Sequence, residues 1–378
     1  MRIVKTLLGG FDVWLFGAVV LLTLLGLVTM YTFEGENIFF ERQVLWTFIS
    51  IGAFVLALIP DYRFLRNGNT LFFIYLAIIF LLILVLIIGT TVKGAQSRFD
   101  IGFFAIQPSE YAKLVLIAVL AKYFSKRHEL IGDFKHILVS GMYAFAVFAL
   151  VAIQPDFGSA LILFFIWFGM VLVSGISPRH LAVVGVVGAT AFTLLWTFGF
   201  QDYQKERILT FLNPLADIQG AGYNAYQSTI AVGSGQWVGK GVGYGTQSKL
   251  QYLPEYETDF VFAAFAEEWG FVGAFLLFSL FGMVIWRLLR HALRAATNFE
   301  RLFAIGVAIL FISHFFVHIG MNIGLLPVTG TTIPFLSYGG SHLMTEFIAV
   351  AMVIAMRRYA KFPYTKNEMS EALLRQDG

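Results

Sequence analysis

The chain has 378 residues, of which 58% are hydrophobic and only 13% are charged, and its formal net charge is +3. Because a soluble domain typically has about 25% charged residues, this composition excludes a water-soluble globular protein and favours a chain that exposes apolar surface to lipid. The chain has no cysteine, which excludes disulfides, cysteine nucleophiles and thiolate metal sites.

Apolar segments recur along almost the whole chain, and a helix needs about 20 apolar residues to cross the hydrocarbon of a bilayer. Backbone groups in hydrocarbon must be paired within their own segment, which favours helices over strands. The first segment lacks a cleavage site of the A-x-A type and is too long for a signal peptide, so we predict that it is the first span. We predict an all-α, polytopic integral membrane protein with about ten transmembrane helices, near residues 11–31, 44–60, 70–89, 109–125, 137–153, 158–175, 180–200, 260–286, 302–324 and 342–357.

The basic residues indicate the orientation, because cytoplasmic connections of membrane proteins are enriched in Lys and Arg. If the N-terminus is inside, most of the 26 basic residues fall on the inner side, in short connections such as those that contain Arg63, Lys126 and Arg290. We therefore predict a multi-pass protein with both termini in the cytoplasm.

We predict one transmembrane domain over residues 1–364 and a polar cytoplasmic tail over residues 365–378. A large extracytoplasmic loop, at about 201–258, connects the seventh and eighth predicted helices. Loops longer than about 15 residues are usually functional or disordered. Aromatic residues such as Trp237 and Tyr252 occur throughout this loop, so we predict that it is ordered and packed on the outer membrane face.

Charged side chains in or near the spans are candidates for function, because each costs a few kcal/mol in hydrocarbon unless it is paired or hydrated. The motif QPSEYAK, at residues 107–113, places proline where it fits the first turn of a helix. Glu110 and Lys113 are three residues apart, so they share a helix face and can pair. This pair could anchor the helix, bind a ligand, or do both.

A second acidic residue, Asp156, lies in the turn QPDFGS at residues 154–159. It could cap the following helix or act directly in an outer cavity, and the sequence leaves both roles open.

Three carboxylates lie in the segment LPEYETDF, at residues 253–260, where the eighth predicted span begins. Thr258 or Asp259 could cap that helix. Asp259 directly precedes Phe-Val-Phe, where water gives way to lipid, and a partly desolvated carboxylate suits a general base.

Three further carboxylates lie within predicted spans, Glu267 and Glu268 in the eighth and Glu346 in the last. Adjacent residues point in different directions around a helix, so Glu267 and Glu268 are not expected to form an acid–base dyad. We interpret all three as partners of the basic inner connections.

Two outer segments are rich in glycine. GSGQWVGKG, at residues 233–241, does not fit a nucleotide-binding phosphate loop, because glycine follows the lysine; we predict that its backbone N–H groups and Lys240 face a diphosphate or a sugar. In PFLSYGGS, at residues 334–341, Ser337 and Ser341 could donate hydrogen bonds to a ligand. The seven histidines form no ligand-spaced cluster, so no metal site is predicted.

Four of these motifs resemble those of the SEDS family, the shape, elongation, division and sporulation proteins. The resemblance covers essentially the whole chain, and the motifs occur in the family's order. The segments GTQS and PVTG resemble the elongation branch (RodA) more than the division branch (FtsW). The four motifs are QPSEYAKL at 107–114, QPDFGSA at 154–160, GTQSKLQYLPEYETDFVFAAFAEEWG at 245–270 and GLLPVTGTTIPFLSYGGS at 324–341.

This resemblance implies a peptidoglycan glycosyltransferase of the bacterial cytoplasmic membrane, which polymerises lipid II on the outer face during cell elongation. It also implies a class B penicillin-binding protein, a transpeptidase, as partner. The family's catalytic aspartate corresponds to Asp259, its cavity glutamate and lysine to Glu110 and Lys113, and the aspartate of its QPD motif to Asp156.

The chain departs from the family pattern at four positions. Glu257 stands where histidine is common, Phe99 where tryptophan is usual, Gln236 where a third glycine is common, and His318 where asparagine is frequent. None of the departures changes Asp259, although the loss of a histidine beside it could alter proton transfer or phosphate binding.

The residues and the implied reaction agree physically. A lipid diphosphate is a good leaving group, so the site needs a base for the acceptor hydroxyl and positive charge for the diphosphate. Asp259 would be the base, and in-line attack would invert the anomeric centre. A divalent cation (Mg or Mn) could share the neutralising task, and the lipid tails require a groove open to the bilayer, with the large outer loop as its lid. The outer cations available are Arg98, Lys113, Arg207 and Lys240.

A lipid II flippase is the main alternative, because Glu110, Lys113 and Asp156 are charges that a polar headgroup path would use. Against a flippase, the polar motifs cluster on the outer face, and no matched pair of broken helices is evident. A scaffold without activity would leave the outer carboxylates unexplained, and a glycoside hydrolase would need a second acid facing Asp259. The predicted partners are therefore the transpeptidase, lipid II and membrane lipids, with no nucleic acid.

Overall fold

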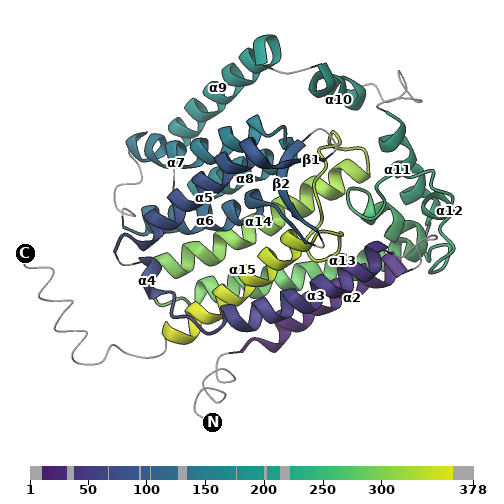
Figure 1. Cartoon of the computed structure of the whole chain (residues 1–378), viewed down its shortest axis with the longest axis horizontal. Helices are drawn as coiled ribbons and strands as arrows, with labels where there is room; N and C mark the ends of the chain where they lie inside the picture. The colour runs from purple at the N-terminus through teal and green to yellow at the C-terminus, as the bar shows by residue number, and fades with distance from the viewer. Residues whose placement is uncertain are drawn as a thin grey trace, which may run out of the picture.

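Long helices run roughly side by side through the molecule, with a small sheet and short helices at one end (Figure 1). The computed structural model describes residues 11–31, 38–66, 68–92, 95–102, 104–126, 134–175, 177–199, 202–212 and 222–360. The first half of the chain contributes the long helices α2 (Val13–Tyr31), α3 (Ile38–Ala57), α5 (Thr70–Ile88), α6 (Pro108–Ser125), α7 (Phe134–Ile153) and α8 (Phe157–Val173). The second half contributes α9 (Pro178–Leu194) with the π-helical turn η1 (Leu195–Gly199), α13 (Val261–Leu293), α14 (Asn298–Asn322) and α15 (Gly340–Ala360).

The described helices confirm the predicted helical membrane fold, since eight of them are long and apolar enough to cross a bilayer. Two others are largely buried among their neighbours. Helix α8 has only 17 residues, and α6 carries Glu110, Lys113 and Lys122 within its 18 residues. These two helices would complete the ten predicted spans, so the count of ten stays a prediction.

Short elements occupy the connections. Helix α4 (Arg63–Arg66) follows α3, and α10 (Asp202–Leu212), α11 (Tyr223–Ser234) and α12 (Thr246–Lys249) lie within the predicted large outer loop. The connection before α6 forms three antiparallel strands in sequence order, which the sequence analysis did not predict. Such strands have open edges, which are tolerated outside the hydrocarbon because water can pair them. The strands are β1 (Thr90–Val92), β2 (Ala95–Ile101) and β3 (Phe104–Ile106).

Helices α14 and α15 lie at the centre of the bundle, and α9 lies at its edge (Figure 1). The most apolar windows of α14 and α15 are 61% and 78% buried, whereas that of α9 is 0% buried. Small residues permit the central packing: a Cβ atom added to Gly306 of α14 would lie 2.5 Å from Ile117 Cγ2 of α6 and 3.2 Å from Met170 Sδ of α8.

Helix α13 is broken at Gly270, whose φ of 63° and ψ of −162° are accessible essentially only to glycine. A break within a span leaves backbone groups unpaired. Here the two residues after Gly270 donate to carbonyls of segment 235–241, and N–H groups of that segment donate to the carbonyls of Glu267 and Glu268, at 2.9 to 3.0 Å in each case. The glycine-rich segment therefore completes the hydrogen bonding of the broken helix.

The end of the bundle opposite the small sheet, which is the predicted inner end, is held by a buried acid. The Asp12 carboxylate, just before α2, accepts hydrogen bonds from Arg287 Nη2 at 2.6 Å and from the Leu15 N–H at 3.0 Å, and lies 2.8 Å from His291 Nε2. Burial raises the pKa of Asp12, but hydrogen bonds from His291, Arg287 and Leu15 outweigh it and hold that pKa well below its usual range. This inner cluster (Asp12, Arg287 and His291) ties α2 to the end of α13.

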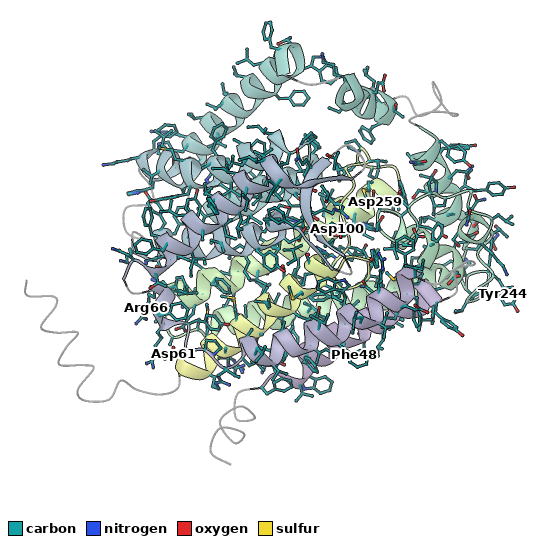
Figure 2. The ribbon with its side chains drawn as sticks, in the orientation of Figure 1. Phe48, Asp61, Arg66, Asp100, Tyr244 and Asp259 are labelled. Carbon is teal, nitrogen blue, oxygen red and sulfur yellow. The ribbon has the colours of Figure 1, made fainter. Side chains whose placement is uncertain are left out.

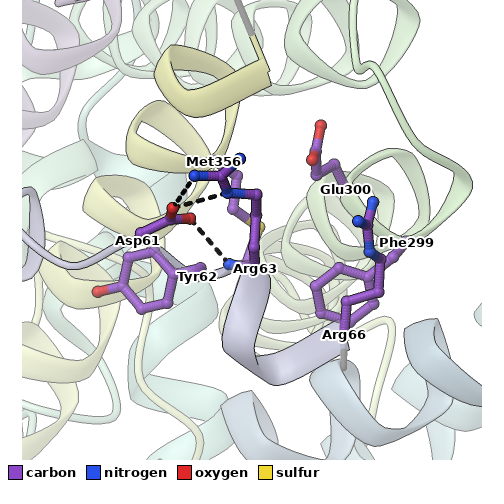
Figure 3. Close-up of a pocket in the computed structure, with 7 residues that line it drawn as sticks. All are labelled: Asp61, Tyr62, Arg63, Arg66, Phe299, Glu300 and Met356. Carbon is purple, nitrogen blue, oxygen red and sulfur yellow. Dashed lines mark hydrogen bonds and ion pairs between the residues drawn. The ribbon is translucent and has the colours of Figure 1, made fainter. Parts of the chain in front are cut away.

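A second ion pair at the predicted inner end lines the pocket drawn in Figure 3. Asp61 Oδ2 lies 2.5 Å from Arg63 Nη2, and Arg66 and Glu300 line the same pocket (Figure 3). Its cavity of about 10 Å³ has room for about one water molecule. The pocket is therefore too small for a sugar or a lipid headgroup.

Candidate active site

The candidate site lies at the end of the bundle that carries the small sheet. Asp259 and Asp100 lie at this end, whereas Asp61 and Arg66 lie at the other (Figure 2). This separation agrees with the predicted division into an outer face with the polar motifs and an inner face with basic connections.

The turn between α14 and α15 brings two of the predicted motifs together. An added Cβ at Gly158, two residues after Asp156, would lie 2.8 Å from Thr329 O, and one at Gly330 would lie 3.5 Å from Asp259 Oδ2. Gly330 has φ of +72°, a conformation that favours glycine. The turn therefore passes between the QPD motif and Asp259, and its glycine lets the backbone approach the carboxylate.

Asp259 is half-buried and directly precedes the buried Phe260 at the start of α13. Its backbone carbonyl accepts a hydrogen bond from Asn322 Nδ2 at 3.0 Å, and the Asn322 side-chain oxygen accepts from the Ala263 N–H at 3.1 Å. One asparagine at the end of α14 thus fixes the backbone on both sides of the first turn of α13. The predicted position of Asp259, at the boundary between water and apolar interior, agrees with this burial.

The segment before Asp259 is also ordered by its acidic residues. Thr258 Oγ donates to Glu255 Oε2 at 3.2 Å. Burial of Tyr256, together with the nearby charge of Glu257 and their hydrogen bond, raises the pKa of Tyr256 to about 12. The phenol of Tyr256 is therefore a neutral hydrogen-bond donor, and Glu257, which stands where a histidine was expected, is its partner.

Ser337 supports this segment, and its predicted role as a substrate-binding hydroxyl stays a prediction. Its Oγ donates to Thr258 O at 2.9 Å and accepts from the Ile333 N–H at 3.0 Å, and the residue is 2% exposed. Ser341 is similarly engaged, because its Oγ donates to Ala105 O at 2.6 Å and accepts from the Gln107 N–H. Both hydroxyls are already used to join the turn to neighbouring segments.

Gln43 of α3 also holds this turn, although it was not among the predicted site residues. Its Nε2 donates to Ser337 O at 3.2 Å, and its Oε1 accepts from the Gly339 N–H at 3.3 Å. Gln43 is followed by the mostly apolar remainder of α3, and a polar amide at that position was the signal that could have identified it.

The predicted pairing of Glu110 with Lys113 is confirmed, at 2.7 Å between Oε1 and Nζ. Lys113 is only 1% exposed, and its ammonium also lies 3.3 Å from His314 Nε2. Glu110 Oε2 lies 2.8 Å from His342 Nδ1, and His342 Nε2 lies 2.9 Å from Glu346 Oε1. These five residues form a buried outer cluster (Glu110, Lys113, His314, His342 and Glu346), of which the sequence analysis identified only the first pair as a site.

The interpretation of Glu346 as a partner of the inner connections was wrong. Its Oε1 faces His342, and its Oε2 accepts a hydrogen bond from the Phe335 N–H at 2.9 Å. The interpretation failed because the distance along α15 from Glu346 to Arg357, about 1.5 Å per residue, is too great for a side-chain contact.

The outer cluster does not fit a metal ion. Ligand atoms of Glu110, His314 and His342 lie within 4.8 Å of one another. However, the Lys113 ammonium lies at 2.7 Å from Glu110 and 3.3 Å from His314, so a cation already occupies the centre of this group. A divalent ion there would face strong repulsion from the ammonium.

Asp156 caps α8, as one of the two open interpretations predicted: its Oδ1 accepts from the Ser159 N–H at 3.0 Å. Its Oδ2 accepts from Gln107 Nε2 at 2.9 Å and lies 3.5 Å from Ser109 Oγ. The carboxylate therefore joins the QPD motif to the QPSE motif. A direct contact of Asp156 with substrate stays a prediction.

Arg98 lies on β2 and is half-buried, and its Nε has no hydrogen-bond partner among the described residues. The sheet that carries it is joined to α15 through the Ser341–Ala105 hydrogen bond. Of the cations predicted to bind the diphosphate, Arg98 therefore has an N–H group beside the site that can still donate a hydrogen bond. The side chain of Arg207 lies outside the described part of the chain.

Lys240 pairs with an acidic residue within the chain, and its predicted contact with a diphosphate or a sugar stays a prediction. Its ammonium lies 2.7 Å from Glu267 Oε1 and 2.7 Å from Thr246 Oγ1. Glu267 is fully buried and also accepts from the Thr246 N–H and the Gln247 N–H. Lys240 therefore neutralises a buried carboxylate of α13.

The interpretation of Glu267 and Glu268 as partners of inner connections was also wrong. Glu267 holds Lys240 and the start of α12, and Glu268 Oε1 accepts from the Gly243 N–H at 3.0 Å. Both carboxylates therefore hold the glycine-rich outer segment.

Comparison with known proteins gives a consistent result over most of the chain. Residues 5–362 match the model of a cell cycle protein family that takes in FtsW, RodA and SpoVE. Peptidoglycan glycosyltransferase MrdB of Escherichia coli (strain K12) is 39% identical over 289 residues, which cover 76% of this chain and 78% of MrdB.

Two solved structures share the fold. A chain from a study of the coordination of polymerization and crosslinking by a peptidoglycan synthase complex has a TM-score of 0.80 and 29% identity, covering 93% of this chain and 99% of that chain. The rod shape determining protein RodA of Thermus thermophilus has a TM-score of 0.71 and 29% identity, covering 93% of this chain and 98% of RodA.

Proposed function

Because the chain belongs to the FtsW, RodA and SpoVE family of cell cycle proteins, we propose that it is a peptidoglycan glycosyltransferase that polymerises lipid II on the outer face of the bacterial cytoplasmic membrane. The observation that carries this proposal is the half-buried carboxylate of Asp259, held where α13 begins and beside the turn that joins it to Asp156. The name of MrdB, a peptidoglycan glycosyltransferase, supports the same activity.

In the proposed reaction, Asp259 takes the proton from the 4-hydroxyl of the acceptor sugar as that oxygen attacks the anomeric carbon of the donor. The bond between this carbon and the diphosphate oxygen breaks, and undecaprenyl diphosphate leaves with the bonding electrons. Attack from the opposite side inverts the anomeric centre. The hydrogen bonds from Asn322 and Ser337 to the backbone around Asp259 hold the base in place without consuming its proton-accepting capacity.

The departing diphosphate needs positive charge. Arg98 is the cation that the described contacts favour, because its Nε is unpaired among the described residues and its strand adjoins the start of α6. Lys113 and Lys240 are each within 2.7 Å of a carboxylate, so their charge is already balanced in this conformation. A divalent cation (Mg or Mn), when bound to the diphosphate, would supply additional charge neutralisation.

The lipid tails of donor and acceptor must reach the site from within the bilayer. Helix α9 lies apart from the central helices in Figure 1, and its apolar window has no buried share. We place the entry of the tails on this side, beneath the segment that carries α10 and α11.

A class B penicillin-binding protein is the proposed partner, because a chain of similar fold belongs to a peptidoglycan synthase complex that couples polymerization with crosslinking. The GTQS and PVTG segments favour a role in cell elongation. We propose that both termini lie in the cytoplasm, a proposal supported by Arg287 and Arg290 of α13 and Arg357 of α15, which lie at the helix ends opposite Asp259.

The contacts do not favour a flippase. Glu110 and Lys113 pair with each other, and Glu346 and His342 close the cluster, so these charges form no open path for a headgroup. Polymerisation of lipid II by the purified protein with its transpeptidase partner tests the proposal. Asp259→Ala should abolish glycan polymer, and Asp100→Ala, an exposed aspartate at the same end, should not. Polymer from Asp259→Ala, or lipid movement across liposomes without polymer, would contradict it.

A further inference from the structure

Two histidines of the outer cluster, His314 and His342, have different partners at their ring nitrogens, and these partners constrain where each ring carries its protons. His314 Nε2 lies 3.3 Å from the Lys113 ammonium, which can only donate. His314 Nε2 must therefore accept, and its proton is on Nδ1, which lies 3.1 Å from Thr332 O. His314 is thus a neutral imidazole that joins Lys113 to the turn after α14.

His342 has carboxylates at both ring nitrogens. Nδ1 lies 2.8 Å from Glu110 Oε2, and Nε2 lies 2.9 Å from Glu346 Oε1. The distance between His342 Nε2 and Glu346 Oε1 is that of an ion pair, although the angles between the two groups are not those of a hydrogen bond. Ionised carboxylates only accept, so protons on both nitrogens turn two repulsive contacts into attractive ones. The ring is 6% exposed, so water does not screen these contacts.

With both carboxylates ionised, the charges of the cluster balance only with this proton. Glu110 and Glu346 contribute two negative charges, and Lys113 contributes one positive charge. Glu346 is 2% exposed, and a net charge in such a place is costly. We propose that His342 is a positioning residue: as an imidazolium it balances the two buried carboxylates and, through Glu346, fixes the turn of residues 333–339 beside Asp259.

A chain of contacts leads from His342 to the backbone next to Asp259. Glu346 Oε2 accepts from the Phe335 N–H at 2.9 Å, and Phe335 has φ of +64°, which a bulky residue rarely adopts. Two residues later, Ser337 Oγ donates to Thr258 O at 2.9 Å, and the Tyr338 N–H donates to Glu257 O at 2.9 Å. Loss of the anchor at Phe335 would therefore let the turn relax and displace the residues that precede Asp259. This positioning role rests on the proposed function, whereas the charge state of His342 does not.

The charge state has a direct spectroscopic test. Protein with ¹⁵N-labelled histidine, placed in lipid bilayers at neutral pH, should give one imidazolium signal pair that disappears in His342→Gln. His314 should give the signals of a neutral Nδ1–H tautomer. A neutral ring at position 342 would overturn the proposal, whatever the activity of the protein.

The positioning role is tested by a cycle of His342→Gln, Glu346→Gln and the double variant. Each single change leaves one unbalanced buried charge, and we expect turnover of lipid II to fall about 10- to 100-fold with little change in KM, because the base is misplaced. The double variant restores neutrality, and the amide oxygen introduced by Glu346→Gln can still accept from the Phe335 N–H. We therefore expect the double variant to recover turnover and thermal stability to within about threefold and a few degrees of the unchanged protein.

His180→Gln, a histidine on α9 away from the cluster, is the matched control and should change neither quantity. A double variant as impaired as the worse single variant would show that the ring acts by shape alone, which contradicts the proposal. If the unchanged protein makes no polymer, the proposed function fails, while the spectrum and the stability cycle still decide the charge of His342.

Discussion

The outer and inner clusters are built from the same kinds of side chain but connect different parts of the molecule. In the inner cluster, Asp12 joins Arg287 and His291, so it ties the start of α2 to the end of α13. In the outer cluster, Glu110 and Glu346 join Lys113 and His342, and the contacts continue into the turn that adjoins Asp259.

This difference shows how one kind of interaction serves two purposes. A buried ion pair between helix ends contributes mainly to the stability of the bundle, whereas one that continues into an irregular turn also fixes the geometry of that turn. The inner cluster is therefore expected to affect folding alone, and the outer cluster to affect both folding and catalysis. Of the four predictions below, which run from the largest expected effect to the smallest, the first two test this distinction and the other two test neighbouring regions.

Lys113→Met should have the largest effect. It removes the ammonium but keeps an unbranched side chain, and it leaves Glu110 and Glu346 with one positive partner. Breaking a buried pair by removal of one member typically costs about 3–5 kcal/mol, and we expect a loss of this size in the free energy of unfolding in detergent, together with loss of polymer. Glu110→Gln combined with Lys113→Met restores neutrality and should recover most of the stability. A single variant of unchanged stability would show that the pair is not a structural element of the outer cluster.

Asp12→Asn should reduce stability but leave the activity of the folded protein intact. The carboxylate accepts hydrogen bonds from Arg287, and such bonds to charged groups are worth about 1.5–3 kcal/mol. Because the pKa of Asp12 is lowered by folding, its contribution is fully present above the ordinary aspartate pKa of about 3.9 and is lost as the pH falls below that value toward the folded pKa. Asp12→Asn should therefore lose less stability than the unchanged protein as the pH falls below about 3.9. A fall in turnover per folded molecule would remove the distinction between the two clusters.

Much of the fold follows from the sequence, because apolar length and basic connections are strong constraints in a membrane. The predicted segment 260–286 corresponds to the outer part of α13, and 302–324 corresponds to α14. The segment 44–60 missed the start of α3 at Ile38, because Glu41 and Arg42 in its first turns are charged yet helical. The break at Gly270 was missed, since a single glycine within an apolar run gives no sign of the segment that completes its hydrogen bonds.

The site was predictable only in part. The short-range pattern of Glu110 and Lys113 reveals a pair because both lie on one helix face. The partners His314 and His342 come from two other helices, and only the fold brings them to the same place. Lys240 was assigned to a ligand because its segment is glycine-rich and outer, but those glycines serve close backbone contact with α13: an added Cβ at Gly239 would lie 2.0 Å from Glu268 O.

Gly270→Ala tests a third region, where the glycine-rich segment meets the broken helix. The observed φ of 63° is strained for alanine, and the new Cβ would lie 2.2 Å from Gly239 N. Backbone strain of this kind costs about 1–3 kcal/mol, so we expect a loss of stability of that size, measured by denaturant titration. Gly282→Ala, on the same helix with open space around it, is the control and should be close to neutral. An equal response of the two variants would mean that the break in α13 is not held by segment 235–241.

Tyr256→Phe should have the smallest effect. The variant tests whether Tyr256, in the segment before Asp259, takes part in proton transfer. The pKa of Tyr256 is raised to about 12, so the phenol stays protonated throughout the range in which the enzyme would work and cannot be the base. Its contribution to stability is fully present below the ordinary tyrosine pKa of about 10 and is lost as the pH rises through the folded value. We expect Tyr256→Phe to cost about 1 kcal/mol of stability at neutral pH and to leave the shape of the pH–rate profile unchanged. A step in that profile that disappears in the variant would assign proton transfer to Tyr256 and remove the reason for giving that role to Asp259 alone.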